Sequence, residues 1–183
     1  MKKTLSKKEI FMRNTVSILG IPIDNVSMVE ALNIVKRFLN EDRLHTVYTP
    51  NSEIMMAAQR DPELKKILCE ADLLVPDGAG VVLASKINGC PLKERVAGFD
   101  LTNMLFSDDA SKNIKFFFFG GKPGVAEEAY KNLLDRQINI NVVGIRNGYF
   151  TKDEEKEIIR EINSSNADVL LVVGEGRAQE QPF

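Results

Sequence analysis

A carboxylate stands just beyond a short apolar run in this chain of 183 residues. Asp77 follows the run at residues 73–75, and Gly78 and Gly80 behind it would let a ligand approach the backbone closely. A carboxylate in such a place could act as a general base on a hydroxyl group. The alternative is that Asp77 only caps the helix that follows, and spacing alone favours that interpretation.

A hydroxyl and an amide side chain stand at the end of a predicted strand, residues 45–49. Thr49 and Asn51 flank Pro50 there and could both hydrogen-bond to a ligand. By itself, Asn51 is better explained as the N-cap of the next helix.

A single arginine, Arg95, lies in a loop before a predicted helix. Its planar guanidinium could neutralise a diphosphate through paired hydrogen bonds. A surface ion pair with Glu94 or Asp100 is the competing explanation, and the sequence does not decide between the two.

A glycine pair, Gly120-Gly121, joins a strand to a helix whose first turn is predicted to hold Pro123. Backbone N–H groups in such a turn could meet a phosphate. The pattern resembles a degraded dinucleotide fingerprint, but the next strand ends at Arg146-Asn147 without the acidic residue that a ribose-binding NAD site prefers. The pattern therefore favours a phosphate-binding site over an NAD-binding site. An NAD(P)-dependent oxidoreductase is a weaker alternative.

Other reactive side chains are better explained by structural roles than by catalysis or metal binding. Asp108-Asp109 could be mistaken for a metal-binding pair, but its surroundings are typical of a solvated loop at a helix end. His45 is the only histidine, so a Ser-His-Asp hydrolase has little support. Cys69 and Cys90 lack CxxC spacing and are expected to be reduced thiols.

Composition places the chain among ordinary globular domains. Its formal net charge of -2 gives no general attraction to nucleic acid. No stretch approaches the roughly 18 continuous apolar residues of a membrane span. The basic start, residues 1–14, is expected to be a solvated tail that could touch an anionic membrane surface.

The elements that must position these side chains alternate regularly along the chain. Six strands are expected, at residues 16–23, 45–49, 73–75, 114–119, 139–145 and 168–173. Amphipathic helices lie between them, and capping boxes at Ser27 with Glu30 and at Thr151 with Glu154 open two of the helices. This alternation predicts an α/β domain at residues 15–183, with a mainly parallel sheet and helices on both faces. Ligands of such folds bind beyond the carboxyl ends of strands, where the candidates stand.

Taken together, these segments resemble the bacterial WecG/TagA/CpsF glycosyltransferase family from about residue 16 to residue 174. The matching stretches are VYTPN (47–51), ADLLVPDGAG (71–80), ERVAGFDL (94–101), FGG (119–121), GYF (148–150) and ADVLL (167–171). The PDG and ERVAGxD blocks together are quite specific.

The resemblance implies a Rossmann-like domain and an inverting transfer of a sugar, with N-acetylmannosamine as the best guess. The donor would be a UDP-sugar, and the acceptor N-acetylglucosamine on undecaprenyl diphosphate, at the inner face of the membrane in cell-wall polymer synthesis. Asp77 matches the catalytic base, and Thr49, Asn51 and Arg95 match other active-site positions. Expected substrate-binding residues are Gly78, Gly80, Gly120, Gly121, Tyr149, Gly174 and Gln179. No metal or cofactor is expected to be essential.

Two departures from the family pattern bear on activity. The family shows Gly-x-Gly-x-Pro-x-Gln-Glu after its last strand here, whereas this chain lacks the proline, and the place of Gln179 in the pattern depends on the alignment. Family members also continue past the position of Phe183, so this chain is expected to lack a C-terminal segment. A nucleotide-sugar-binding fragment without activity is the alternative, and exposure of an apolar patch would favour a homo-oligomer.

Overall fold

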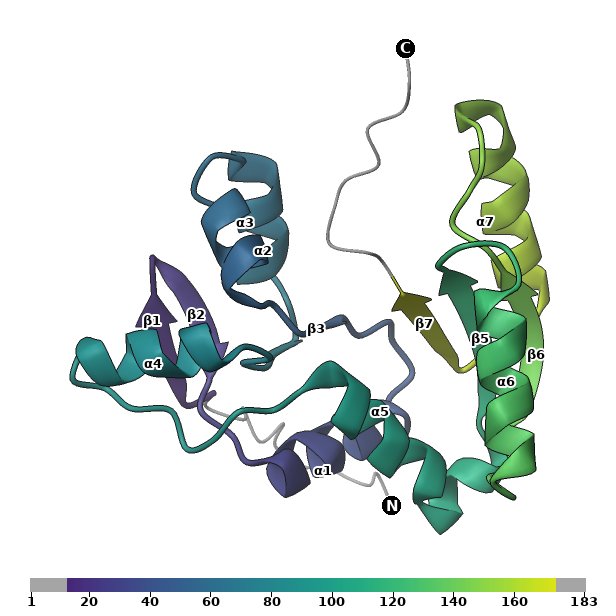
Figure 1. Cartoon of the computed structure of the whole chain (residues 1–183), viewed down its shortest axis with the longest axis horizontal. Helices are drawn as coiled ribbons and strands as arrows, with labels where there is room; N and C mark the ends of the chain where they lie inside the picture. Colours follow the sequence, from purple (N-terminus) through teal and green to yellow (C-terminus); the bar gives the residue numbers. More distant parts are fainter. Residues whose placement is uncertain (1–12, 174–183) are drawn as a thin grey trace, which may run out of the picture. The chain divides into compact units, whose positions relative to one another are not determined.

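The computed structural model describes residues 13–173, which fall into two compact units (Figure 1). The first contains the described residues up to Asn33 and residues 43–98, and the second contains residues 34–42 and the described residues from Phe99 onward. The single catalytic domain at residues 15–183 stays a prediction. Most of the expected basic tail lies outside the described residues.

The first unit opens with a β-hairpin. β1 (Thr15–Ile18) pairs antiparallel with β2 (Ile21–Asp24). The prediction of one strand over residues 16–23 is therefore wrong. Leu19 and Gly20 both have positive φ, at 53° and 76°. Two such residues make the tight turn whose twist matches a hairpin, so the chain reverses where Gly20 suggested only a break.

Helix α1 (Met28–Phe38) follows and contributes residues to both units. Its predicted capping box is confirmed. The Glu30 N–H donates to Ser27 Oγ at 3.2 Å, and the Ser27 N–H donates to Glu30 Oε2 at 2.7 Å. A hydrogen bond from Lys93, followed in size by the one from the Ser27 N–H, lowers the pKa of the Glu30 carboxyl.

Two short parallel strands form the middle of the first unit. β3 (Val47–Tyr48) pairs with β4 (Leu73–Leu74). Between them lie α2 (Ser52–Ala57) and α3 (Pro62–Cys69), which confirms the predicted break near Asp61. The Asp61 carboxylate caps α3 by accepting two backbone N–H bonds, and α4 (Ala79–Ile87) follows β4.

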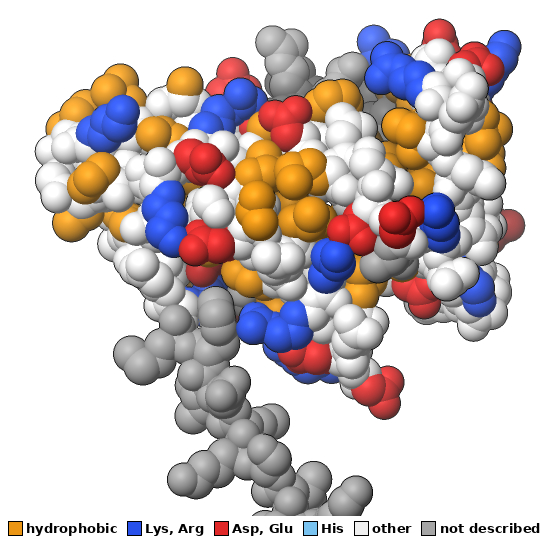
Figure 2. Space-filling view, turned by 90° about the horizontal axis from the view of Figure 1, so that it is seen from below, with side chains coloured by type: hydrophobic (Ala, Val, Ile, Leu, Met, Phe, Trp, Pro, Cys, Tyr) orange, Lys and Arg blue, Asp and Glu red, His pale blue; other side chains and the backbone are white. Residues whose placement is uncertain are grey.

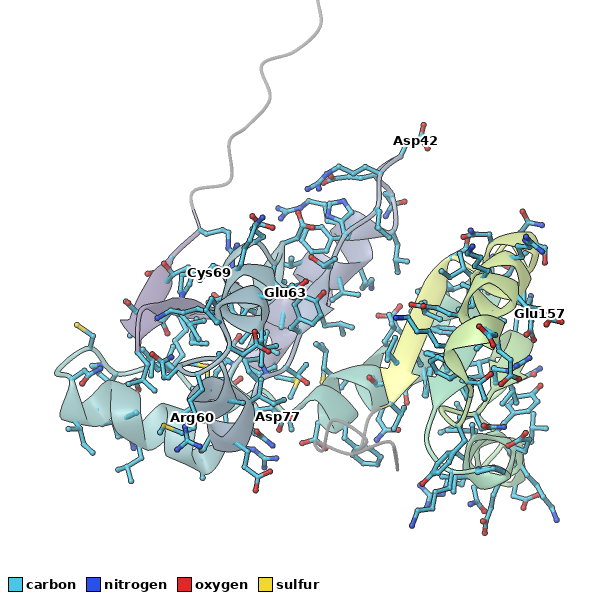
Figure 3. All side chains as sticks on the ribbon, turned by 90° about the horizontal axis from the view of Figure 1, so that it is seen from above. Asp42, Arg60, Glu63, Cys69, Asp77 and Glu157 are labelled. Carbon is cyan, nitrogen blue, oxygen red and sulfur yellow. The ribbon has the colours of Figure 1, made fainter. Side chains whose placement is uncertain are left out.

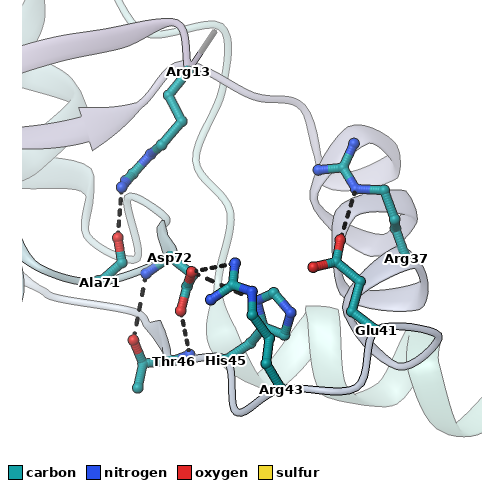
Figure 4. Close-up of polar contacts among 8 residues, drawn as sticks. All are labelled: Arg13, Arg37, Glu41, Arg43, His45, Thr46, Ala71 and Asp72. Atoms are coloured by element: carbon teal, nitrogen blue, oxygen red, sulfur yellow. Dashed lines mark hydrogen bonds and ion pairs between the residues drawn. The ribbon is translucent and has the colours of Figure 1, made fainter. Parts of the chain in front are cut away.

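The hairpin is tied to β4 by a buried carboxylate. Asp24 is 3% exposed and accepts the Leu74 N–H at 2.7 Å. Arg13 pairs with the same carboxylate. It also donates to the Ala71 carbonyl (Figure 4). Arg13, expected within the solvated tail, is therefore a partly buried structural residue.

The second unit is built on a three-stranded parallel sheet. Its strands are β5 (Lys115–Gly120), β6 (Asn141–Arg146) and β7 (Val169–Val173), in the order β6-β5-β7. The connecting helices are α6 (Val125–Asp135) and α7 (Glu155–Ser164), with the short η2 (Lys152–Glu154) before α7.

The strand order places helices on both faces of this sheet. The step from β5 to β6 and the step from β6 to β7 run in opposite directions across it. Because parallel crossovers are right-handed, α6 and α7 must cover opposite faces. The predicted Rossmann-like α/β class is confirmed, although the described strands form three separate sheets.

The core of the second unit is aromatic. α5 (Gly98–Ser107) leads into it and is followed by η1 (Asp109–Asn113). Phe116 and Phe117 of β5 are almost fully buried, and Phe106 of α5 packs edge-on against Phe116. Pro123 precedes α6 rather than lying in its first turn, because the left-handed Gly124 turns the chain before the helix begins.

Candidate active site

Parallel pairing brings two of the predicted site segments to one edge of the first unit. Beyond the paired strands, the Val75 N–H donates to the Tyr48 carbonyl at 3.0 Å, and the Asp77 N–H donates to the Pro50 carbonyl at 3.3 Å. The residues after β3 and those after β4 therefore run side by side. Thr49, Asn51 and Asp77 stand at the same edge, as the strand pattern predicted.

The carboxylate of Asp77, labelled in Figure 3, contacts both the start of a helix and an arginine. Its Oδ2 accepts the N–H of Gly98, the first residue of α5, at 3.1 Å. The expectation that Asp77 caps the helix directly after it is wrong, because Gly78 is the N-cap of α4. Asp77 instead reaches 21 residues along the chain to a different helix.

Arg95 pairs with Asp77. Its Nη2 lies 3.2 Å from Asp77 Oδ1, and its Nε donates to the Asp77 carbonyl at 3.3 Å. Arg95 therefore forms an ion pair, as the competing explanation supposed, but with Asp77 rather than with Glu94 or Asp100. Glu94 accepts the Met28 N–H instead. The Arg95 side chain is 55% exposed against 26% for Asp77, so the guanidinium can still reach an anion in solvent.

Asn51 has the structural role that its position predicted. It is the N-cap of α2, and its Oδ1 accepts the Ile54 N–H at 3.0 Å. Its Nδ2 has no hydrogen-bond partner among residues 13–173, so the amide N–H groups remain available to a ligand. Capping and ligand binding are therefore compatible for this side chain.

Glycines at this edge make room for polar side chains. A Cβ on Gly80 would lie 2.2 Å from Ser52 Oγ, and one on Gly98 would lie 2.7 Å from Thr49 Oγ1. Gly78 has only ordinary contacts at 3.4 Å, so its surroundings do not require a glycine. Ser52 and Gly98 were missed by the sequence reasoning, although Gly98 belongs to the ERVAG block and Ser52 directly follows Asn51.

A second group of predicted site residues lies in the second unit. The Gly121 N–H donates to the Val173 carbonyl, and the Gly148 N–H donates to the Gly121 carbonyl, both at 2.9 Å. β7 therefore already uses the Gly121 N–H, and the expected contact of this turn with a phosphate stays a prediction. Gly120 adjoins this turn, and Tyr149 next to Gly148 is about half exposed. Gly174 and Gln179 lie outside the described residues.

The acidic pair at Asp108-Asp109 does not converge on one point. Asp108 pairs with Lys36 at 2.6 Å, and Asp109 pairs with Lys112 at 2.7 Å. Within residues 13–173 no cluster of three or more metal-ligand side chains occurs.

Arg146, one of the residues that suggested an oxidoreductase, pairs with two carboxylates. Its guanidinium lies 3.3 Å from Glu154 and 3.1 Å from Glu161. Two carboxylates around it disfavour binding of the extra phosphate of NADP. Hydrogen bonds from Thr151 to the Glu154 carboxylate complete the predicted capping box and lower the pKa of Glu154.

The only histidine belongs to a cluster around Asp72, at the opposite end of β3 from the site (Figure 4). His45 Nδ1 lies 3.5 Å from Asp72 Oδ1, and Arg43 pairs with the same oxygen at 2.9 Å. Burial acts to raise the pKa of Asp72, but the Thr46 N–H bond and Arg43 outweigh it, and the pKa is lowered. This cluster secures the loop before β3.

Residues 16–181 match the family model described as glycosyl transferase WecG/TagA/CpsF family. A protein of Bacillus spizizenii (strain ATCC 23059 / NRRL B-14472 / W23), named N-acetylglucosaminyldiphosphoundecaprenol N-acetyl-beta-D-mannosaminyltransferase, is 33% identical over 135 residues, which are 74% of this chain and 52% of the relative. A protein of the same name from Bacillus subtilis (strain 168) is 26% identical over 159 residues, covering 86% of this chain and 61% of the relative. The chain thus spans between half and two thirds of these relatives' lengths, and it belongs to the WecG/TagA/CpsF glycosyltransferase family.

Proposed function

We propose that this chain carries the catalytic part of a hexosyltransferase that moves N-acetylmannosamine from UDP to N-acetylglucosamine on undecaprenyl diphosphate, with inversion. The observation that carries the proposal is the position of Asp77. Asp77 lies beyond β4 at the same edge as Thr49 and Asn51, and its carboxylate pairs with the half-exposed Arg95. Both named relatives carry an activity of this kind in their names.

The chemistry assigns one role to each kind of group. The acceptor hydroxyl oxygen forms a bond to the anomeric carbon of the donor while its proton passes to Asp77. The bond between that carbon and the diphosphate oxygen breaks, and its electron pair leaves with UDP. Attack from the face opposite the leaving group inverts the anomeric centre. In this proposal, Thr49 and the Asn51 Nδ2 orient a sugar near Asp77.

The contact of Arg95 with Asp77 and its exposure to solvent also support the proposal. It holds Asp77 at rest, yet over half of its side chain is exposed. A diphosphate offers the guanidinium a stronger partner than one carboxylate oxygen. Binding of substrate would draw Arg95 toward phosphate and leave Asp77 Oδ1 open to accept the proton.

Transfer by the purified chain tests the catalytic assignment. Radiolabelled UDP-N-acetylmannosamine and a lipid-linked N-acetylglucosamine acceptor are the substrates. Asp77→Asn is expected to lower transfer by about 10²–10⁴-fold, the usual contribution of a general base. Asp61→Asn is the matched control, because Asn caps helices as well as Asp does. Equal rates for Asp77→Asn and the wild-type chain would contradict the role of Asp77.

Calorimetric titration with UDP tests donor binding separately. Binding is expected to weaken in Arg95→Ala and in Gly121→Val, since Gly121 has a φ of 69° that a branched side chain rarely adopts. It is expected to survive in Asp77→Asn. If UDP binds and no transfer occurs, the chain is a nucleotide-sugar-binding fragment. If NADP binds in place of UDP, the proposal fails.

The proposal includes independence from metal ions and a position at the inner face of the membrane. Arg95 supplies positive charge for the departing UDP. Transfer is therefore expected to be unchanged in EDTA, and loss of activity that Mg²⁺ restores would refute this point. Peripheral contact with the lipid-linked acceptor is part of the proposal. Among residues 13–173, none of the helices has the length and hydropathy of a membrane span.

A further inference from the structure

Helix α4 buries a serine and exposes two large apolar side chains, which is unusual for a surface helix. A surface helix normally turns an apolar stripe to the core and polar residues to water. On α4, Leu83 is 58% exposed and Ile87 is 77% exposed. Ser85 is 0% exposed; its hydroxyl donates to the Val82 carbonyl and accepts the Leu92 N–H at 3.0 Å.

The exposed residues of α4 share one face. Ala79, Leu83 and Ile87 are spaced four apart, so they form a stripe along the helix. Lys86 is also exposed and lies three residues after Leu83, beside that stripe. We call this surface the α4 face: Ala79, Gly80, Leu83, Lys86 and Ile87. Val81 packs on the opposite side into the core of the first unit.

The α4 face carries only positive charge. α4 contains no acidic residue, and Lys86 in its last turn is its only charged group. In Figure 2, the left end of the view, where α4 lies, shows hydrophobic side chains with basic ones beside them. Apolar side chains with a flanking lysine suit a lipid surface, because the apolar groups enter the acyl boundary while the ammonium stays among anionic headgroups.

We infer that the α4 face docks onto an anionic lipid bilayer. The inference rests on the proposed function, since α4 begins two residues after Asp77. An acceptor sugar joined through a diphosphate to a membrane lipid stays within a few ångströms of the headgroups. The helix beside the base must then lie near the bilayer, and its exposed apolar stripe is the surface that can enter it.

The absence of tryptophan allows a direct test. Leu83→Trp and Ile87→Trp each place a single reporter on the α4 face. With vesicles of phosphatidylglycerol and phosphatidylcholine in equal parts, their emission is expected to shift to the blue and to be quenched by brominated acyl chains. Leu44→Trp is the matched control, because Leu44 is 87% exposed before β3. An unshifted spectrum at both α4 positions would overturn the inference.

Charge substitution gives an independent measurement. Leu83→Glu combined with Ile87→Glu is expected to weaken partitioning onto these vesicles by at least about tenfold, because it removes two apolar side chains and adds repulsion from anionic lipid. Leu44→Glu is expected to bind as the wild-type chain does. Circular dichroism and thermal unfolding check that both variants fold. Unchanged partitioning of the folded double variant would overturn the inference.

Two further readouts separate this inference from the proposed function. Light scattering shows whether the α4 face pairs with a second copy instead: a dimer that the double variant dissociates, without vesicle binding by the wild-type chain, refutes membrane docking. Transfer to a short-chain, water-soluble acceptor tests catalysis alone. The double variant is expected to keep that activity and to lose transfer to acceptor held in vesicles. Failure of the wild-type chain on the soluble acceptor would count against the proposed function, even where vesicle binding persists.

Discussion

Asp77 serves the fold and the proposed reaction through different properties. Its Oδ2 needs only to accept the Gly98 N–H, which a neutral amide can also do. Taking a proton from a sugar hydroxyl requires a carboxylate. The two roles can therefore be separated by substitution at this one position.

Asp77→Asn and Asp77→Ala are expected to lose transfer equally but to differ in stability. Asn keeps an acceptor for the first N–H of α5, whereas Ala leaves it without a partner. Loss of a cap costs about 1 kcal/mol, so the free energy of unfolding in urea should fall by that amount in Asp77→Ala only. Equal stability of the two variants would show that the contact with Gly98 contributes nothing.

The cluster around Asp72 predicts a dependence of stability on pH. The pKa of Asp72 is lowered below its ordinary value of 3.8 in the folded chain. A carboxyl with a depressed folded pKa stabilises the fold above its unfolded pKa, and this contribution is lost as pH falls through the folded pKa. Urea unfolding from about pH 6 down to about pH 2 should show a shallower acid decline in Asp72→Asn. Arg43→Gln should also make the acid decline in stability shallower. An unchanged pH profile in both variants would refute the role of Asp72.

Residue types alone identified the carboxylate but not its partners. Asp77, Thr49 and Asn51 were found because strand ends are readable from apolar runs. The pairing of Asp77 with Gly98 and Arg95 depends on how the loop at residues 94–98 folds back, since the Val96 N–H bonds to the Pro76 carbonyl. Such a contact between distant segments leaves no periodic pattern in the sequence.

At the scale of elements, the turn after β5 is the tightest point of the second unit. A Cβ on Gly120 would lie 1.9 Å from the Val173 carbonyl oxygen, and its φ is 114°. β5 and β7 therefore approach so closely that only a glycine fits between their ends.

Gly120→Ala is expected to destabilise the chain by about 2–5 kcal/mol, from backbone strain and the forced separation of β7. Gly124→Ala is the matched control. Gly124 also has a positive φ, of 86°, but nothing lies within 4 Å of its added Cβ, so about 1 kcal/mol is expected. Equal losses in urea unfolding would contradict the close approach.

Helices and buried strands were predictable because their signals are local. Both capping boxes followed from side chains three residues apart, and the break at Asp61 followed from the adjacent Asp61-Pro62 pair. The β1–β2 hairpin was missed because Leu19 carries no turn preference, and only the pairing of the flanking strands holds it at positive φ.

At the scale of the whole molecule, parallel strands and the α/β class followed from the alternation of elements. The grouping of contacts into two compact units did not follow, because local signals do not report which elements share a core. α1 contributes residues to both units, and α5 begins in the first and continues into the second.

These shared helices predict a single unfolding transition, because a helix melts cooperatively along its length. Leu83→Trp reports on the first unit and Val125→Trp on the second, each added to the tryptophan-free chain. Gly120→Ala is expected to shift both urea midpoints together, as one domain requires. A shift confined to the second reporter would show that the units unfold independently.

The contact between Asp77 and the start of α5 has a consequence for the order of events in turnover. Substrate binding first draws Arg95 toward phosphate, and the acceptor's proton then passes to Oδ1, because Oδ2 already accepts the Gly98 N–H. The neutral acid keeps Oδ2 as an acceptor, so the first turn of α5 stays capped while the proton escapes to water. Chemistry would thus proceed without local opening, and amide hydrogen exchange at Gly98 would be no faster during steady turnover than with either substrate alone.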